Sequence, residues 1–472
     1  MKCLICTSEA VPFAGTGGLS EVCTSLGIEL CKSDIDCRVV MPLYSDIEVK
    51  YRDKMEFVKS FNVPLAWRSI YCGVFKLFYK GVMFYFIDNE YYFKRCGLYG
   101  HYDDAERFAF FSRAILEMLP NVEFKPDIIH CNDWQTALVS VFYSTIYAKY
   151  EWYYNIKTVF TIHNIQYQGK YGKELFSDIL GLPEKDFSFL EFEGCINFMK
   201  GAIEASNRVT TVSKTYSYEI LDPWFSHGLS PILNARKFKI EGILNGIDTD
   251  SYNPQTDPDI YVNYDKNSIG LKLDNKLELQ KRLNLNVREE IPMIGMVTRM
   301  VSHKGLDIVR EAFDELMKED IQFVILGSGD SEYERFFDYM QGKYEGKVSS
   351  CHGFVPELSR KIYAASDIFL MPSKSEPCGL AQMIALRYGA IPIVRETGGL
   401  FDTIKDSGDN KGNGFTFKNY DPWDMLSAIK RSIAGYYNRD GWEILVKRAM
   451  GCNNSWKASA ERYIELYNTL IK

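Results

Sequence analysis

Two cationic residues, Arg299 and Lys304, lie five positions apart, directly after a predicted strand, "PMIGMVT", at 292–298. A diphosphate that leaves a reacting centre develops negative charge, which a lysine and an arginine converging on it can stabilise. Lys304 also falls where a helix is expected to begin, and the helix dipole disfavours a cation there unless an anion is bound. Two ordinary surface charges at a helix start would give the same pattern, so this pair alone leaves both interpretations open.

Glycine-containing segments recur beside expected helices. "EPCGL" at 376–380 and "TGGL" at 397–400 each precede one, and the first N–H groups of a helix have no intrahelical partner and can bind phosphate. A third segment, "GTGGL" at 15–19, follows the first expected strand, and its adjacent glycines allow a ligand to approach the backbone closely. That segment has no basic residue to indicate phosphate, and a glycine pair is often only a turn.

Two more side chains have types suited to catalysis. Glu376 opens the "EPCGL" segment, and His163 follows the expected strand "TVFTI". Each also has a structural interpretation, since a glutamate favours the start of a helix and a lone histidine at a strand end is often a structural hydrogen-bonding group. Glu376 is the only carboxylate identified beside these segments. A double displacement of the kind that retaining glycosidases use requires a positioned pair of carboxylates, so it would have no nucleophile here.

The elements that position these residues follow from the hydrophobic pattern. Short apolar runs alternate with longer amphipathic stretches, which is typical of parallel strands joined by helices and predicts two doubly wound α/β units. All the segments above fall at the carboxyl ends of expected strands, where ligands bind in open parallel sheets. The clearest strands are expected at 3–8, 37–42, 127–132, 158–164, 208–213, 292–299, 322–329, 347–354, 367–373 and 391–396, and helices at 105–119, 305–318 and 379–389.

Chain length and turn density predict the domains. A chain of 472 residues exceeds what one hydrophobic core usually supports. The segment 244–268 is rich in Asn, Asp, Pro and Gly, which predicts a first domain at 1–244 and a second at 245–454. The last segment, 455–472, has apolar residues at helical spacing, so we expect a helix that packs back on the first domain.

Composition excludes several classes of protein. The net charge is −7 and no basic run occurs, so we expect no nucleic-acid partner. No apolar run approaches the roughly 20 residues that span a membrane. The apolar stretch at the N-terminus is too short for the apolar region of a signal peptide, so we expect a cytoplasmic protein with no membrane contact. Cys3 and Cys6 have the spacing of a metal motif, but on a strand they point to opposite faces, so we expect no metal.

The content and order of these segments resemble the bacterial glycogen synthases and plant starch synthases. The resemblance covers nearly the whole chain and implies a GT-B fold, in which two facing Rossmann-like domains form the active site in the cleft between them. It also implies transfer of glucose, with retention, from ADP-glucose (or UDP-glucose) to the non-reducing end of an α-1,4-glucan. The segments that carry it are "SEAVPF", "LYGHYDDAERFAFFSRAILE", "HCNDWQTAL", "TIHNIQYQG", "RVTTVSKTY", "LNGIDTDSYNP", "SEPCGLAQMIALRYG" and "TGGLFDT".

The resemblance also implies roles for individual residues. Glu376 would stabilise the oxocarbenium-like sugar or position the donor, His163 would hold the donor glucose near its 6-hydroxyl, and Asp133 would bind hydroxyls. In the implied front-face substitution, the departing phosphate takes the acceptor's proton. The donor and its phosphates would contact Gly17, Gly18, Arg299, Lys304, Cys378, Gly379, Leu380, Thr397, Gly398 and Gly399. The sugar or the acceptor would contact Glu9, Tyr99, Trp134, Asn164 and Asn245.

One position departs from the family pattern. The synthases have Lys-x-Gly-Gly-Leu in the first motif, whereas this chain has Gly15 in place of the lysine. We expect an active but weakened synthase, and the alternative is a non-catalytic glucan-binding or regulatory paralogue. An NAD enzyme is disfavoured because no Gly-x-Gly-x-x-Gly opens the first helix. Nothing resembles the pyridoxal phosphate lysine site of a phosphorylase, so we expect no cofactor.

Overall fold

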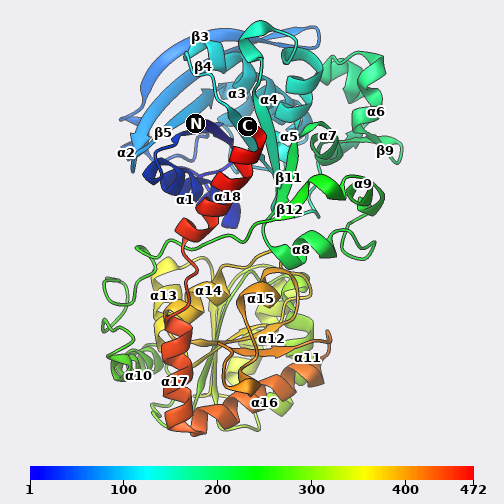
Figure 1. Cartoon of the computed structure of the whole chain (residues 1–472). Helices are drawn as coiled ribbons and strands as arrows, with labels where there is room; N and C mark the ends of the chain where they lie inside the picture. Colours follow the sequence, from blue (N-terminus) through cyan, green and yellow to red (C-terminus); the bar gives the residue numbers. More distant parts are fainter. Residues whose placement is uncertain (472) are drawn as a thin grey trace. The chain divides into compact units, whose positions relative to one another are not determined.

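The computed structural model describes residues 1–471, and the chain forms two compact units (Figure 1). The first unit comprises Met1–Asn245 together with the segment that starts at Trp456, and the second comprises Gly246–Ser455. The chain therefore passes between the units twice. Both units are α/β with parallel strands, which confirms the fold class that the hydrophobic pattern predicted.

The first unit is built on a nine-stranded sheet with the order β12-β11-β7-β6-β1-β2-β5-β4-β3. The strands from β12 to β5 are parallel, and β4 and β3 add an antiparallel hairpin at one edge. A separate three-stranded sheet has the order β8-β10-β9. The strands are β1 (Lys2–Cys6), β2 (Asp36–Pro42), β3 (Glu56–Leu65), β4 (Arg68–Tyr79), β5 (Val82–Asp88), β6 (Ile128–Asn132), β7 (Lys157–Ile162), β8 (Lys170–Gly172), β9 (Glu191–Phe192), β10 (Cys195–Asn197), β11 (Arg208–Thr211) and β12 (Ile240–Gly242).

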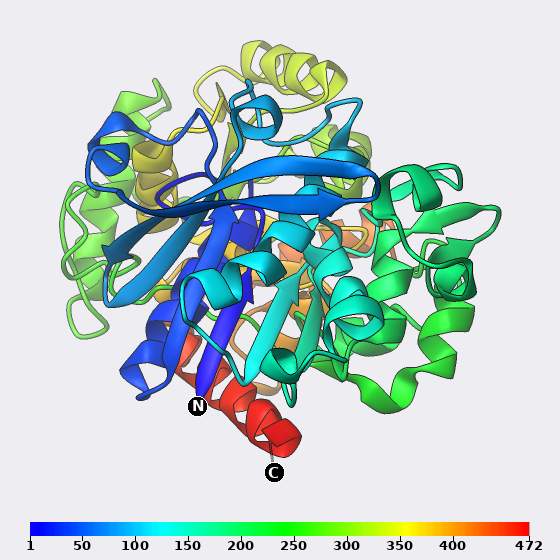
Figure 2. The ribbon, with the colours of Figure 1, turned by 90° about the horizontal axis from the view of Figure 1, so that it is seen from above.

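The core of the first unit lies on both faces of its central strands. In β6, the buried His130 side chain contacts the Tyr467 hydroxyl at 2.7 Å, while the next residue, Cys131, contacts Ser140 on the opposite face. The carboxyl-terminal helix α18 therefore covers one face, where it also packs against α1 (Figure 2). The main helices of the unit are α1 (Gly18–Lys32), α2 (Val49–Arg52), α3 (Glu90–Phe93), α4 (Asp104–Asn121), α5 (Trp134–Phe142), α6 (Phe187–Leu190), α7 (Phe198–Ala205), α8 (Lys214–Glu219), α9 (Ser230–Ala235) and α18 (Trp456–Ile471).

The strands β3, β4 and β5 were not identified from the sequence. The β3–β4 hairpin turns through only Ala66 and Trp67, without the Asn-Gly or Asp-Gly pair that usually indicates such a turn. Ala66 takes a φ of 51°, a conformation that alanine rarely adopts. The expected helix at 105–119 is found as α4, two residues longer at its end.

The second unit has a six-stranded parallel sheet with the order β15-β14-β13-β16-β17-β18. Alternate residues of β14 face opposite layers: Val324 and Leu326 pack with residues of α10 and α13, and Phe323 packs at 5.1 Å from Phe313 of α11. Helices therefore cover both faces. The strands are β13 (Met293–Val297), β14 (Gln322–Gly327), β15 (Val348–His352), β16 (Ile368–Met371), β17 (Ile391–Arg395) and β18 (Phe415–Phe417). The helices are α10 (Lys272–Arg282), α11 (Leu306–Leu316), α12 (Ser331–Lys343), α13 (Pro356–Ala365), α14 (Ala381–Arg387), α15 (Gly398–Thr403), α16 (Pro422–Tyr437) and α17 (Arg439–Met450).

Two wider features concern partners and metals. No helix within residues 1–471 is long and apolar enough to cross a membrane. Within the same residues, no three His, Cys, Asp or Glu side chains are grouped as a metal site. Cys3 and Cys6 are both buried and free.

Candidate functional site

The second unit contains an ion pair between a half-buried lysine and a buried glutamate at the carboxyl ends of its strands. Lys304 follows β13, and its Nζ donates to both carboxylate oxygens of Glu376, at 2.9 and 2.6 Å. The Ser373 hydroxyl, from the loop after β16, donates to the same carboxylate at 2.9 Å. Burial would raise the pKa of Glu376, but Lys304 and Ser373 together lower it below its ordinary value. Glu376 is therefore held as a carboxylate at neutral pH.

The two loops that carry this pair are tied to each other. The Lys374 N–H donates to the His303 carbonyl at 2.9 Å. Gly305, which separates Lys304 from α11, has a φ of 78°, and a side chain there would collide with the Pro372 carbonyl oxygen. Glycine at 305 therefore lets the loop after β13 lie directly on the loop after β16.

The "TGGL" segment is packed against the loop that carries Glu376. The Gly399 N–H donates to the carbonyls of Glu376 and Pro377, both at 3.2 Å. A side chain at Gly398, which has a φ of 44°, would collide with the Glu376 carbonyl oxygen, and one at Gly399 would lie 2.5 Å from the Cys378 Cα. Both glycines and Thr397 are buried. These glycines thus hold the backbone around Glu376, and their contact with phosphate stays a prediction.

The charges around the ion pair include Arg299 and His303. Arg299 is exposed, and among residues 1–471 no acceptor engages its guanidinium. Burial lowers the pKa of His303, and the positive charges of Lys304 and Arg299 lower it further, whereas Glu376 raises it. The charges of Arg299, Lys304 and Glu376 therefore all act on His303. The Arg299 cation is open to a ligand.

A second cluster lies at the carboxyl ends of β6 and β7, in the first unit. Oδ1 of Asp133 accepts the N–H of His163 at 2.8 Å and that of Asn164 at 3.5 Å. The Asp133 N–H in turn donates to the Thr161 carbonyl at 3.0 Å. The parallel pairing of β6 with β7 brings Asp133 beside His163 and Asn164, three residues that the sequence analysis assigned to one site.

The hydrogen bonds of Asn132 fix which nitrogen of His163 carries the proton. The Asn132 amide nitrogen donates to the carbonyls of Cys6 and His130, at 3.1 and 3.3 Å. The other atom of the amide, Oδ1, is therefore an acceptor, and it accepts a hydrogen bond from the Nε2–H of His163 at 2.9 Å. Burial lowers the pKa of His163 to about 3, so the ring is neutral. Nδ1 is left unprotonated, as an acceptor for a hydroxyl.

Asp133 combines a strained backbone with a raised side-chain pKa. Its φ of 56° and ψ of 179° lie in a region that residues other than glycine rarely occupy, at a cost of about 1–3 kcal/mol. Burial raises its pKa to about 7, against the opposing effect of the two N–H groups, and the charge of Glu9 raises it further. Backbone strain and a shifted pKa of this kind are concentrated at functional sites.

Glu9 and Tyr99 lie beside each other in the same unit. The Tyr99 hydroxyl donates to the Glu9 carboxylate at 2.9 Å and also contacts the Ser8 hydroxyl at 2.7 Å. Glu9 further accepts the N–H and the hydroxyl of Thr16. Burial raises the pKa of Glu9, and the Thr16 and Tyr99 bonds oppose that rise. Glu9 therefore anchors the glycine segment 15–18.

The glycine segment itself is open. Residues 15–18 are exposed, and a side chain at Gly17, the residue before α1, would meet no atom within 4 Å. Nothing in the described chain requires glycine at 17, so the space beside it is available to a ligand. Gly15 differs, because a Cβ there would lie 2.8 Å from the Cβ of Ser20.

Two of the expected sugar-binding residues lie apart from these hydrogen-bond networks. Trp134 is 9% exposed and packs in an aromatic cluster, with its ring centroid 5.1 Å from that of Phe108 and 6.4 Å from that of Phe198. Asn245 is buried, and its side-chain oxygen has no hydrogen-bond partner within residues 1–471. A stacking role for Trp134 and a sugar contact for Asn245 stay predictions.

Two residues that position the site were missed in the sequence. Ser373 holds Glu376, and Asn132 holds His163. Both stand next to motifs that had been recognised, at the ends of expected strands. A hydroxyl three residues before a buried glutamate was a usable signal, whereas the role of Asn132 depends on pairing between strands that the sequence does not show.

Comparison with known proteins identifies the family to which this fold belongs. Residues 2–235 match the starch synthase catalytic domain family, and residues 278–442 match the glycosyl transferases group 1 family. Glycogen synthases of Desulforamulus reducens and Clostridium acetobutylicum are 50% and 49% identical to the chain, which covers 99% and 100% of their lengths and is itself covered completely.

Solved structures give the same result. The catalytic domain of starch synthase IV from Arabidopsis thaliana, bound to ADP and acarbose, superposes with a TM-score of 0.91 at 35% identity, over 100% of this chain and 99% of that one. Sucrose-phosphate synthase from Thermosynechococcus elongatus, at 16% identity and a TM-score of 0.63 over 99% and 98% of the two chains, shares the fold.

The protein is thus a glycosyltransferase with the GT-B fold. Within the glycosyltransferases, the family follows from the 50% and 49% sequence identity over the full length of its relatives. The chain belongs to the glycogen and starch synthase family, as its motifs predicted.

Proposed function

We propose that the protein transfers glucose, with retention, from ADP-glucose to the non-reducing end of an α-1,4-glucan, with UDP-glucose as a second possible donor. The observation that carries the proposal is the pairing of Lys304 with the buried Glu376 carboxylate, beside the open Arg299 cation. The related starch synthase IV was solved with ADP and acarbose, a nucleoside diphosphate and an oligosaccharide analogue, which supports this donor and acceptor class.

In this proposal the second unit binds the diphosphate. Arg299 can bind a phosphate without giving up an existing partner, and Lys304 can contact the phosphate while it keeps Glu376 ionised. As the bond to the diphosphate breaks, these two cations stabilise the charge of the leaving group. The Glu376 carboxylate stabilises the positive charge on the sugar, and the departing phosphate accepts the proton of the acceptor hydroxyl. Cys378, Gly379 and Leu380 complete the donor loop.

Residues of the first unit are assigned to the sugar hydroxyls. Nδ1 of His163 accepts a hydroxyl of the donor glucose, because Asn132 and burial keep that nitrogen unprotonated. Asp133 binds hydroxyls with its second carboxylate oxygen, which accepts no hydrogen bond from residues 1–471. Gly17 and Gly18 let the substrate approach α1, and Glu9 and Tyr99 line that segment.

Glucose incorporation into glycogen from ADP-glucose and from UDP-glucose, measured on the intact protein, tests the proposal. We expect transfer from ADP-glucose to be faster. A protein inert with both donors, for every primer tried and also after Gly15→Lys, would contradict it and favour the non-catalytic paralogue. The full-length similarity to glycogen synthases does not favour that alternative.

A further inference from the structure

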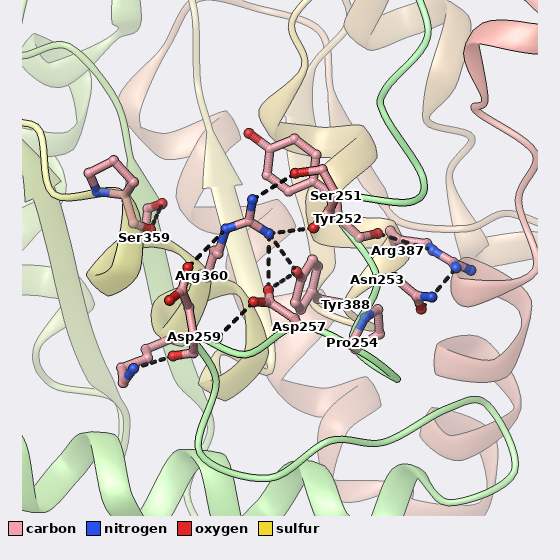
Figure 3. A network of polar contacts seen from close by, with 12 residues as sticks. Ser251, Tyr252, Asn253, Pro254, Asp257, Asp259, Ser359, Arg360, Arg387 and Tyr388 are labelled. Atoms are coloured by element: carbon pink, nitrogen blue, oxygen red, sulfur yellow. Dashed lines mark hydrogen bonds and ion pairs between the residues drawn. The ribbon is translucent and has the colours of Figure 1, made fainter. Parts of the chain in front are cut away.

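A buried polar network of the second unit shows what a structural cluster looks like in this protein. Arg360 donates to the buried Asp257 carboxylate at 3.0 Å and to the Ser251 carbonyl at 2.6 Å (Figure 3). The Tyr388 hydroxyl donates to the same carboxylate. These bonds pair the charges with one another and fasten the segment 251–257 to α13, so the network stabilises the fold. A cluster of thiols in the first unit differs, because its members can react with one another.

Three cysteines of the first unit lie next to one another. Cys3 of β1 and Cys37 of β2 are paired directly across the two parallel strands, and their side chains are in hydrogen-bond contact. The Cys37 thiol also contacts Cys31, in the last turn of α1, whose own thiol donates to the Cys37 carbonyl at 3.3 Å. All three thiols are free. The cluster lies at the amino ends of β1 and β2, away from the carboxyl ends that carry the candidate site, so it is independent of the proposed transfer.

A tight turn between α1 and β2 holds Cys31 beside Cys37. The Ile35 N–H donates to the Leu30 carbonyl at 3.2 Å, and Asp34 takes a φ of 59°. The chain therefore reverses its direction within a few residues and returns along α1. Because the two thiols are already in contact, a disulfide between them requires only a local adjustment.

The three thiols differ in exposure and in acidity. Cys3 and Cys37 are 0% and 2% exposed, whereas Cys31 is half-buried and borders the exposed residues 32–34. A hydrogen bond from the Cys37 thiol lowers the pKa of Cys31 to about 7, against the opposing effects of burial and of the Asp36 charge. Contacts with Cys3 and Cys31 raise the pKa of Cys37 well above its ordinary value. An oxidant from solvent therefore meets a partly ionised thiol at Cys31, with a protonated thiol behind it.

We propose that Cys31 and Cys37 are a reactive thiol pair that a hydroperoxide converts reversibly to a disulfide. In the first step the Cys31 thiolate attacks the peroxide: an S–O bond forms, the O–O bond breaks, and the oxygen that leaves takes up a proton and departs as an alcohol, or as water from hydrogen peroxide. In the second step the Cys37 sulfur attacks the Cys31 sulfenic acid: an S–S bond forms, the S–O bond breaks, and the departing hydroxide takes the Cys37 proton and leaves as water. The two thiols thus supply the two electrons that reduce the peroxide.

The second thiol determines how the oxidation ends. A sulfenic acid without a neighbouring thiol can be oxidised further to the sulfinic and sulfonic acids, whereas a disulfide is restored by reduction. The pair formed by Cys6 and Cys131 provides a contrast within the same sheet. These two residues are also in register across parallel strands, with thiols in contact, but both are 0% exposed, and burial raises the pKa of Cys6. We therefore expect Cys6 and Cys131 to stay reduced while the protein is folded.

Peptide mass spectrometry tests the proposal on the intact protein. The folded protein is treated with hydrogen peroxide, the remaining thiols are blocked, and the chain is then unfolded and digested with trypsin. Trypsin separates residues 3–32, which contain Cys31, from residues 33–38, whose one cysteine is Cys37. We expect these two peptides to become cross-linked and fragmentation to place the bond at Cys31. Dithiothreitol should release the cross-link.

Cysteine variants separate the roles of the thiols. Cys31→Ser should lose the cross-link, whereas Cys3→Ala should keep it, because Cys3 is not the partner. Cys37→Ala should also lose the cross-link and should accumulate a sulfenic acid at Cys31, which dimedone labels. Cys96 is exposed, and no thiol of residues 1–471 contacts it. Cys96→Ser is therefore the matched control and should leave the cross-link unchanged.

Several outcomes would overturn the proposal. One is the absence of the cross-link in the parent protein, and another is a bond that fragmentation places at Cys3, which needs no variant to detect. A cross-link that persists in Cys31→Ser, or a Cys31 sulfenic acid as abundant in the parent as in Cys37→Ala, would do the same. Oxidation of Cys6 and Cys131 as fast as that of Cys31 would also overturn it, because the oxidation would then follow from opening of the fold and not from the position of this pair.

Discussion

The two candidate clusters use burial in opposite ways. In the first unit, burial shifts the pKa values toward the neutral forms: that of Asp133 rises to about 7, that of Glu9 rises, and that of His163 falls to about 3. In the second unit, the pKa of Glu376 is lowered despite comparable burial, because Lys304 and Ser373 contact its carboxylate. One cluster is thus poised to be neutral and the other stays charged.

This difference matches the two kinds of group that a sugar donor presents. Hydroxyls bind well to neutral acceptors and donors, and a desolvated site makes such hydrogen bonds selective. A diphosphate requires cations, and a developing positive charge on the sugar requires an ionised carboxylate. In the proposed function the Lys304–Glu376 pair serves both needs, and Lys304 keeps the Glu376 carboxylate ionised. Variants that neutralise one cluster or charge the other therefore test the comparison directly.

The largest effect is expected from removing the charges of the second unit. Glu376→Gln should lower kcat by about 10²–10³-fold, the usual cost of losing one transition-state electrostatic contact. Lys304→Ala should be as inactive and should also destabilise the fold by about 3 kcal/mol, because it leaves a buried carboxylate unpaired. Steady-state transfer and urea unfolding measure the two effects.

A double variant separates catalysis from stability. Lys304→Met combined with Glu376→Gln removes both charges and should recover most of the stability lost in Lys304→Ala. Transfer should remain absent. If transfer recovered together with stability, the Lys304–Glu376 pair would be structural only. The proposed difference between a charged cluster in the second unit and a neutral cluster in the first would then have no catalytic meaning.

The next effect is a pH dependence of stability that belongs to the first unit. The pKa of Asp133 is about 7 in the folded protein, compared with an ordinary value of 3.8. The folded state therefore binds the proton more tightly than the unfolded state, so this contribution to stability is full below pH 3.8 and is lost as the pH rises through 7. Asp133→Asn keeps the oxygen that accepts the N–H groups but cannot ionise.

Relative to the parent, Asp133→Asn should gain stability as the pH rises, up to about 4 kcal/mol at pH 8, and should match the parent near pH 4. Urea unfolding at several pH values measures this difference. Asp103→Asn is a suitable control of opposite sign, because Arg95 lowers the pKa of Asp103 against the effect of its burial. A constant difference between Asp133→Asn and the parent at all pH values would contradict the shifted pKa.

The sequence predicted the second cluster more completely than the first. Arg299, Lys304 and Glu376 stand at the ends of apolar strands that are easy to recognise, and two glycine segments mark the backbone that must pack around them. Lys304 and Glu376 were assigned separate roles, however, and their pairing arises only when β13 and β16 lie side by side.

In the first cluster, residue types were predictable but their protonation was not. Asp133 was expected to bind hydroxyls as a carboxylate, and its raised pKa depends on burial and on Glu9, a residue 124 positions earlier. The tautomer of His163 depends on Asn132, whose amide is oriented by a carbonyl from β1. Such effects come from neighbours across the sheet, which local patterns do not record. The β3–β4 hairpin was missed for a local reason, since its turn at Ala66 and Trp67 lacks a glycine.

A smaller effect is expected from Asn132, which positions His163. Asn132→Ala should leave the ring neutral but free to protonate either nitrogen, so kcat/KM should fall about tenfold, the cost of one hydrogen bond. The ¹⁵N shifts of His163 report the tautomer directly and should change from one form to a mixture. Ser140→Ala, another buried polar residue of the first unit, should alter neither. An unchanged tautomer in Asn132→Ala would contradict this role.

The smallest effect concerns Gly15, where the family has a lysine. A lysine could add one charge-assisted contact, worth roughly 10- to 150-fold in rate, but its Cβ would lie 2.8 Å from the Cβ of Ser20. Ser20 also donates to the Gly17 carbonyl at 2.8 Å, so displacing it disturbs the glycine segment. Gly15→Lys alone should therefore gain less than about tenfold in kcat/KM with ADP-glucose. Adding Ser20→Gly should raise the gain, whereas Gly15→Met, with the same collision and no charge, should gain nothing. An equal gain from methionine would mean that the charge missing at position 15 does not limit the enzyme.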